Sequence, residues 1–173
     1  MDQQRGGAVR AVGPQGEIDL GTRDHVVELE HEGGYMFLAR FITEDGQVHM
    51  DEPAPLGPGG HPEGVSLLAA AAAYCLSASL VFALKKVRIE PRSVRTTSRA
   101  HLARTPERYR RVSGLDIDIQ VAVAETDRKA LERVLPKFPD FCIVTESIRG
   151  GFPITLRVHH PWGVHEHVLP ARK

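Results

Sequence analysis

The chain has 173 residues, enough for one ordinary domain with a sizeable apolar core. Its 22 lysines and arginines balance 22 aspartates and glutamates, so no overall electric field draws it to nucleic acid or to an anionic membrane. Cys75 and Cys142 are the only cysteines, too few for a disulfide scaffold and without the paired spacing of a structural zinc site, so they are either core residues or redox groups.

The N-terminal part of the chain divides into an arm and a small sheet. Residues 1–24 are rich in glycine and polar residues and contain no apolar run typical of a signal peptide. We therefore expect a flexible arm over 1–24, a single domain over 25–173, and a cytoplasmic protein. Alternating residues separated by glycine turns then predict a three-stranded antiparallel meander made of His25–Glu30, Tyr35–Phe41 and Val48–Met50.

The next segment predicts a loop followed by a central helix. Residues 51–60 contain three prolines and three glycines and cannot form a helix. After Pro62, the stretch from Leu67 to Leu84 is uncharged, but seven of its residues are alanine. A membrane span needs about 20 strongly apolar residues, so this composition favours a core helix and no association with a membrane.

The C-terminal half alternates between strand and helix signals. Two runs of alternating residues predict strands at Val94–Ala103 and Leu115–Val123. A helix is expected from Thr126, ended or kinked by prolines, and then a short helix capped by Asp140. Ile154–Val158 forms the last strand that the pattern predicts. The element order indicates an α+β fold.

The two cysteines lie in different local environments. Cys75 occupies the middle of the apolar helix, where a thiol often only fills space. Cys142 follows Asp140, and this places it in the first turn of a predicted helix, where unpaired N–H groups and the helix dipole favour a thiolate. Physical chemistry alone therefore predicts Cys142 as the nucleophile.

Two segments carry a resemblance to a known family. The segment HPEGVSLLAAAAAYCLSASL and the segment FPDFCIVTESI, whose cysteines are 67 residues apart, resemble the OsmC/Ohr family of osmotically inducible and organic hydroperoxide resistance proteins. The resemblance implies an α+β, OsmC-like fold, in which antiparallel sheets wrap around central helices in an intertwined homodimer with active sites between the subunits.

The resemblance also implies a thiol peroxidase. Cys75 would reduce an organic hydroperoxide and become a sulfenic acid, and Cys142 would then form a Cys75–Cys142 disulfide, which reverses the assignment made from the helix dipole. A lipoylated protein or a small dithiol would reduce the disulfide, and neither a bound cofactor nor a metal is required. Apolar walls would favour organic peroxides, and the residues expected to supply them are Leu67, Leu68, Leu76, Phe82 and Phe141.

Two further site residues come from the same resemblance. The family's peroxidases pair an arginine with a glutamate about ten residues before the first cysteine. Val65 holds that position here, and Glu63 lies two residues farther from Cys75, about 200° around a regular helix. Arg40 is the candidate arginine, although a solvated strand arginine is an equally good interpretation.

Alternatives remain open at this point. An OsmC-like small-molecule-binding or stress protein with structural thiols would share the same sequence features. The stretch Lys85–Arg111 holds ten lysines and arginines but a single aromatic residue, so a solvated face is favoured over nucleic-acid binding. His165 and His167 would share a strand face, but they lack a firm third metal ligand, so a polar tail is the simpler hypothesis.

Overall fold

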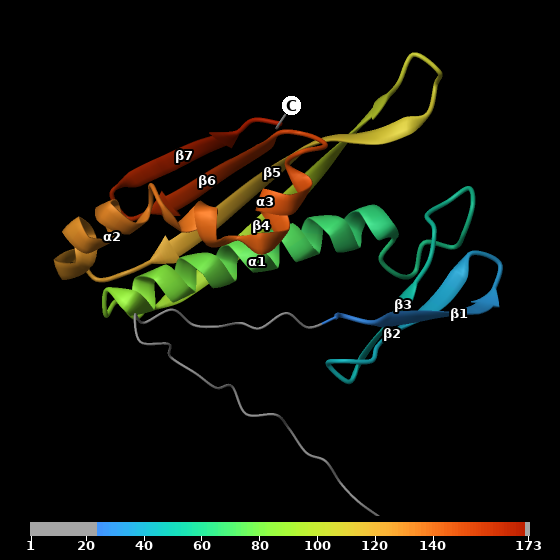
Figure 1. Cartoon of the computed structure of the whole chain (residues 1–173), viewed down its shortest axis with the longest axis horizontal. Coiled ribbons are helices and arrows are strands. Elements are labelled where there is room, and N and C mark those ends of the chain that lie inside the picture. The colour runs from blue at the N-terminus through green and yellow to red at the C-terminus, as the bar shows by residue number, and fades with distance from the viewer. Residues whose placement is uncertain (1–23, 172–173) are drawn as a thin grey trace, which may run out of the picture. The chain divides into compact units, whose positions relative to one another are not determined.

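The computed structural model describes residues 24–171. These residues fall into two compact units that divide between His49 and Met50 (Figure 1). The flexible arm predicted for residues 1–24 lies outside the described residues except for Asp24. The single domain predicted over 25–173 stays a prediction, and each unit is described by itself.

The first unit is the predicted three-stranded sheet. Its strands lie side by side in chain order and are β1 (Val27–Gly33), β2 (Met36–Phe41) and β3 (Gly46–Met50). β1 and β2 pair antiparallel, with Val27 opposite Phe41. The turn between them needs two glycines because Gly33 and Gly34 both have positive φ values, of 120° and 56°.

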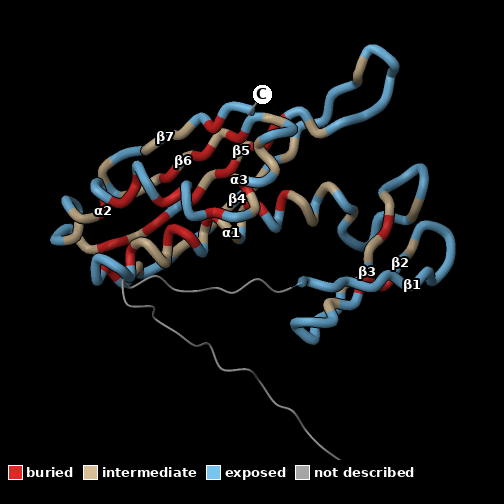
Figure 2. The backbone as a smooth tube through the Cα atoms, viewed as in Figure 1, coloured by how far each residue is buried: buried red, intermediate tan, exposed pale blue. Residues whose placement is uncertain are grey.

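The predicted core helix forms α1, which spans Gly64–Lys86. Lys85 and Lys86 lie in its last turn, where positive charge complements the helix dipole. By length and composition α1 could cross a membrane, but in this structure it packs along β4 and buries one side (Figure 2). The buried residues on that side are Ala69, Ala72, Leu76, Ser79, Leu80 and Leu84.

A four-stranded sheet provides the surface on which α1 packs (Figure 1). Its strands follow the order β4-β5-β6-β7 and span Ser93–Arg104, Arg110–Ala122, Ile154–His160 and Gly163–Leu169. β5 and β6 run parallel, with Leu115 opposite Ile154, so this sheet is mixed, where the resemblance implied an antiparallel one. The buried face carries the core residues Leu115, Ile117, Ile119, Val121, Ile154, Leu156 and Val158.

The histidine-containing tail is not a loose polar segment, and the prediction that Ile154–Val158 is the last strand is wrong. Residues 163–169 form β7, which pairs antiparallel with β6 through contacts such as Val158 opposite His165. Gly163 makes the tight turn possible, because its φ of 152° is rarely adopted by other residues. β7 has only a weak apolar pattern of its own. It is stabilised by pairing with β6, in which alternate residues are buried.

Short helices fill the crossover between the parallel strands β5 and β6. They are the 3₁₀ helix η1 (Glu125–Asp127), α2 (Arg128–Val134), the 3₁₀ helix η2 (Phe138–Phe141) and α3 (Ile143–Ile148). The expectation that Asp140 caps a helix is wrong, because Asp140 lies inside η2 and Cys142 occupies the cap position of α3. Helices and sheets of this kind confirm the α+β class.

Candidate active site

Cys75 and Cys142 come together between α1 and the crossover helices. Cys75 is partly buried in the middle of α1, and Cys142 is fully buried at the junction of η2 and α3. The two thiols are close enough that the Cys75 side chain raises the pKa of Cys142. The contact exists because α1 packs against both η2 and α3, so two residues that are 67 positions apart in the sequence lie side by side.

The environment of Cys142 keeps its thiol protonated. Its pKa is raised from 9.0 to about 11, chiefly by burial and secondly by the neighbouring Cys75 side chain. The side chain and the backbone N–H of Thr145 lower the pKa, but by less than burial raises it. The prediction that Cys142 is predisposed to be a thiolate is therefore wrong, since desolvation outweighs the helix terminus.

Thr145 is a site residue that the sequence analysis missed. Its backbone N–H donates a hydrogen bond to Cys142 Sγ at 3.5 Å. The sequence carries a signal for this contact, because a capping residue commonly accepts a hydrogen bond from the N–H three positions later. The signal was hidden because cysteine is not among the usual capping residues and Asp140 is.

Exposed apolar side chains lie on both sides of Cys142 in the sequence. Phe82 and Phe141 meet edge to face, with ring centroids 6.4 Å apart. Phe141 and Ile143, which flank Cys142, are 60% and 65% exposed. Leu76 instead lies fully in the core and lines no open surface. The junction therefore pairs a buried thiol with an exposed apolar surface made by Phe141 and Ile143.

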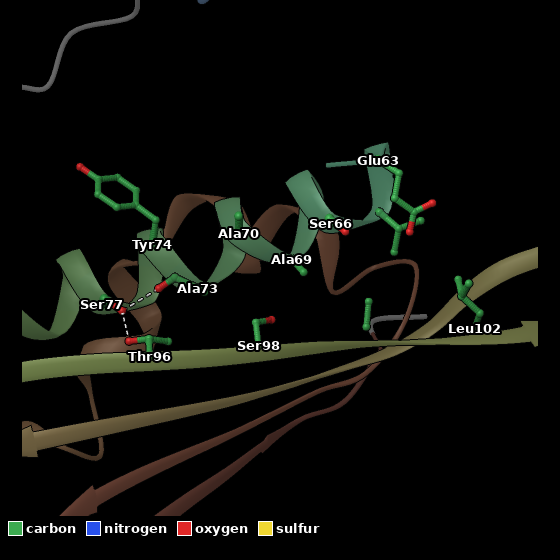
Figure 3. Close-up of a pocket in the computed structure, with 12 residues that line it drawn as sticks. Glu63, Ser66, Ala69, Ala70, Ala73, Tyr74, Ser77, Thr96, Ser98 and Leu102 are labelled. Atoms are coloured by element: carbon green, nitrogen blue, oxygen red, sulfur yellow. Dashed lines mark hydrogen bonds between the residues drawn. The ribbon is translucent and has the colours of Figure 1, made fainter. Parts of the chain in front are cut away.

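Glu63 lies on a different side of α1 from Cys75. It occupies the N-cap position of the helix and lines an open groove of about 640 Å³ between α1 and β4, as Figure 3 shows. Ser77 also lines this groove, and its hydroxyl bonds to Thr96 at 2.6 Å. Cys75 is not among the lining residues. The described chain therefore does not bring Glu63 and Cys75 together, and the catalytic role of Glu63 stays a prediction.

Arg40 belongs to the other compact unit. It lies on β2, where its guanidinium forms an ion pair with the Glu30 carboxylate at 2.5 Å across the β1–β2 ladder. Both side chains are largely exposed. This placement accounts for Arg40 as a surface strand residue, and its proposed action on a thiolate stays a prediction.

The histidines of β7 have structural partners. His167 Nε2 donates a hydrogen bond to the Leu135 carbonyl oxygen at 3.0 Å, and burial lowers the pKa of His167. The rings of His165 and His167 are in contact. Between residues 24 and 171, no three histidine, cysteine or acidic side chains gather as a metal site would require.

The sequence matches the model of one protein family over the part of the chain that holds both cysteines. The family model described as "OsmC-like protein" matches residues 57–157, which include both cysteines, α1 and most of the four-stranded sheet. The chain belongs to the OsmC-like family. No curated protein matches the sequence.

Solved structures of this family share the fold. An OsmC-like protein of unknown function from Vibrio cholerae is 13% identical with a TM-score of 0.69, and the match covers 79% of this chain and 99% of that one. An organic hydroperoxide resistance protein OsmC from Legionella pneumophila is 21% identical, with a TM-score of 0.62 and coverage of 80% and 98%.

The organic hydroperoxide resistance protein OhrB of Bacillus subtilis is more distant in shape. It is 15% identical with a TM-score of 0.54, and the match covers 78% of this chain and 97% of that one. At identities this low the likeness concerns the fold. The Legionella pneumophila and Bacillus subtilis proteins are both named for resistance to organic hydroperoxides.

Proposed function

We propose that the protein is a two-cysteine peroxidase that reduces organic hydroperoxides. The observation that carries this proposal is the contact between a partly exposed thiol, Cys75, and a fully buried thiol, Cys142. Such a pair suits a reaction in which one sulfur meets the substrate and the other closes a disulfide behind it.

The first step takes place at Cys75. Its thiolate attacks one oxygen of the peroxide bond, the O–O bond breaks, and the alkoxide leaves and takes up a proton as the alcohol. The protonated Cys142 supports this step. Cys142 lies beside Cys75, and this neighbouring side chain is one of the causes that raise the Cys142 pKa. A protonated thiol beside another sulfur can donate a hydrogen bond to it when that sulfur becomes negatively charged.

The second step is condensation. Cys142 displaces hydroxide from the Cys75 sulfenic acid, the Cys142 proton joins the hydroxide, and water and a Cys75–Cys142 disulfide result. An external dithiol of the lipoyl type, carried by a protein or free, then reduces the disulfide and is itself oxidised. No bound cofactor or metal is needed for any of these steps.

Apolar surfaces support the substrate class and the assembly. Phe141 and Ile143 expose apolar area beside the thiols, which favours hydroperoxides with an apolar chain. Along α1, the alanine-rich face around Tyr74 is uncovered, with Tyr74 itself 76% exposed. We propose that a second subunit covers this face in a homodimer. In that assembly Glu63 and Arg40 would activate Cys75. We also propose that the protein is cytoplasmic.

Alkylation followed by intact mass measurement tests the peroxidase. The protein is treated with one equivalent of cumene hydroperoxide, alongside Cys75→Ser and Cys142→Ser. We expect an intramolecular disulfide in the wild type, a trappable sulfenic acid at Cys75 in Cys142→Ser, and no fast reaction in Cys75→Ser. If both wild-type thiols stay free under excess peroxide, the protein is not a peroxidase.

A second candidate function rests on the groove between α1 and β4. Its volume of about 640 Å³ is that of a small-molecule site, and its lining combines alanines with the hydroxyls of Ser66, Ser77 and Thr96. An OsmC-like binding protein with structural thiols would use this groove. Such a protein would not react with peroxide, and binding of its ligand would raise its melting temperature.

A further inference from the structure

The hydroxyl of Thr145 is buried beside the candidate disulfide without a hydrogen-bond partner. Thr145 is 0% exposed, and its Oγ1 atom makes no hydrogen bond of normal geometry among the residues that the structure describes, although its side chain acts on Cys142, whose pKa it lowers. Its backbone N–H already points at Cys142 Sγ, at 3.5 Å. A buried hydroxyl without a partner is unfavourable, so it calls for an explanation in some other state of the site.

A charge on Cys142 would provide the missing partner. A neutral thiol sulfur is a weak acceptor, whereas a thiolate accepts strong, charge-assisted hydrogen bonds. The Thr145 side chain is one of the groups that lower the pKa of Cys142, which means that it favours the thiolate. In the reduced resting protein burial keeps Cys142 protonated, so the thiolate must form at another stage.

Reduction of the disulfide is the stage that releases a thiolate. The attacking thiolate of a reductant needs access to one sulfur, and the other sulfur leaves with the bonding electrons. Cys142 is fully buried and Cys75 is partly exposed. Attack therefore falls on Cys75, where a mixed disulfide forms as the Cys75–Cys142 bond breaks, and Cys142 departs as a thiolate.

We propose that Thr145 is a catalytic hydrogen-bond donor that stabilises the Cys142 thiolate released when a dithiol attacks Cys75. Its hydroxyl and its N–H both serve the departing sulfur, which then takes up a proton. The second thiolate of the dithiol attacks the mixed disulfide, frees Cys75 and leaves the reductant as its own cyclic disulfide. This proposal rests on the proposed function, because peroxide turnover supplies the disulfide.

Three variants on α3 test the role of the hydroxyl. Thr145→Val removes it at nearly constant volume, and Thr145→Ser restores it. Ser147→Ala removes an exposed hydroxyl that bonds to the Ile143 carbonyl oxygen of the same helix. The disulfide is formed with diamide, so that the assay does not depend on peroxidase activity. The rate of its reduction by dihydrolipoamide is followed by acid quench, alkylation and intact mass.

We expect Thr145→Val to slow reduction about tenfold or more, as the loss of a hydrogen bond to a charged group does. Thr145→Ser should reduce at nearly the wild-type rate, and Ser147→Ala should be unchanged. Disulfide formation by peroxide should stay fast in all three, because Cys142 reacts there as a thiol. The proposal is overturned if the disulfide of a folded Thr145→Val variant is reduced at the wild-type rate. It is also overturned if Thr145→Ser slows reduction as much as Thr145→Val does.

A second measurement locates the attacked sulfur. The diamide-oxidised wild type is mixed briefly with 2-mercaptoethanol, quenched in acid, denatured and alkylated, and the modified peptides are identified. We expect the mercaptoethanol adduct on Cys75 and the alkyl group on Cys142, and the reverse pattern refutes the proposed direction of attack. A disulfide that forms with diamide but not with hydroperoxide refutes the peroxidase function and leaves the role of Thr145 in disulfide reduction standing. Failure to form it with either reagent refutes both proposals.

Discussion

Replacing Cys142 should change how the stability of the folded protein depends on pH. The pKa of this thiol is raised from 9.0 to about 11 in the folded state, mainly by burial. Between these two values the unfolded chain loses the proton while the folded chain keeps it, so the free energy of unfolding falls as pH rises. Two pKa units correspond to roughly 3 kcal/mol in total, of which about 1 kcal/mol is lost by pH 10.

Urea denaturation of the reduced protein at pH 8, 9 and 10 measures this effect. The quantity of interest is the free energy of unfolding of the wild type minus that of Cys142→Ala, because lysines and tyrosines titrate alike in both. We expect the difference to fall by about 1 kcal/mol across this range. Cys75→Ala serves as the matched control and should keep most of the pH dependence, since burial is the largest cause. A difference that stays constant from pH 8 to 10 would refute the argument that burial controls this thiol.

Three further predictions concern the loop, the uncovered helix face and the core. Gly57→Ala should destabilise the protein by about 1–3 kcal/mol, because a Cβ atom there would collide with the Glu52 carbonyl oxygen. Gly60 lies in open space, so Gly60→Ala should have little effect in the same urea experiment. Equal effects of the two substitutions would contradict the steric argument. Tyr74→Lys should convert a dimer to monomers in light scattering, because it places a charge on the exposed face of α1; an unchanged mass would contradict a helix-mediated interface. Leu76→Ala should cost about 2–5 kcal/mol, because Leu76 is fully buried, and a smaller loss would mean that the core relaxes around the cavity.

Local sequence patterns were sufficient for most of the elements. The meander was predictable because glycine pairs and alternating residues are short-range signals, and α1 was predictable because no other element accommodates so long an uncharged run. β7 was missed because its stability comes from pairing with the buried strand β6, and its own residues, such as His165 and His167, give no strong strand signal.

The site was only partly predictable for a related reason. The meeting of Cys75 and Cys142 depends on how the crossover helices pack on α1, which the resemblance implied and no local pattern could. Glu63 follows the loop proline as the family pattern requires, but the helix begins directly after it, and this start directs Glu63 to the groove beside β4. A sequence spacing cannot specify where a helix begins to within a residue.

The order of the two cysteines shows which physical effect decides the chemistry. The sequence favoured Cys142 as the nucleophile because a helix terminus favours negative charge, an effect that typically contributes about 0.3–1 kcal/mol. Complete burial opposes the charge, and the rise of the Cys142 pKa to about 11 corresponds to roughly 3 kcal/mol against the thiolate. Since α3 has only six residues, its terminus cannot make up the difference. A thiol held neutral in this way is a poor first nucleophile, but beside Cys75 it is well placed to close the disulfide and to depart as the buried sulfur when the disulfide is reduced.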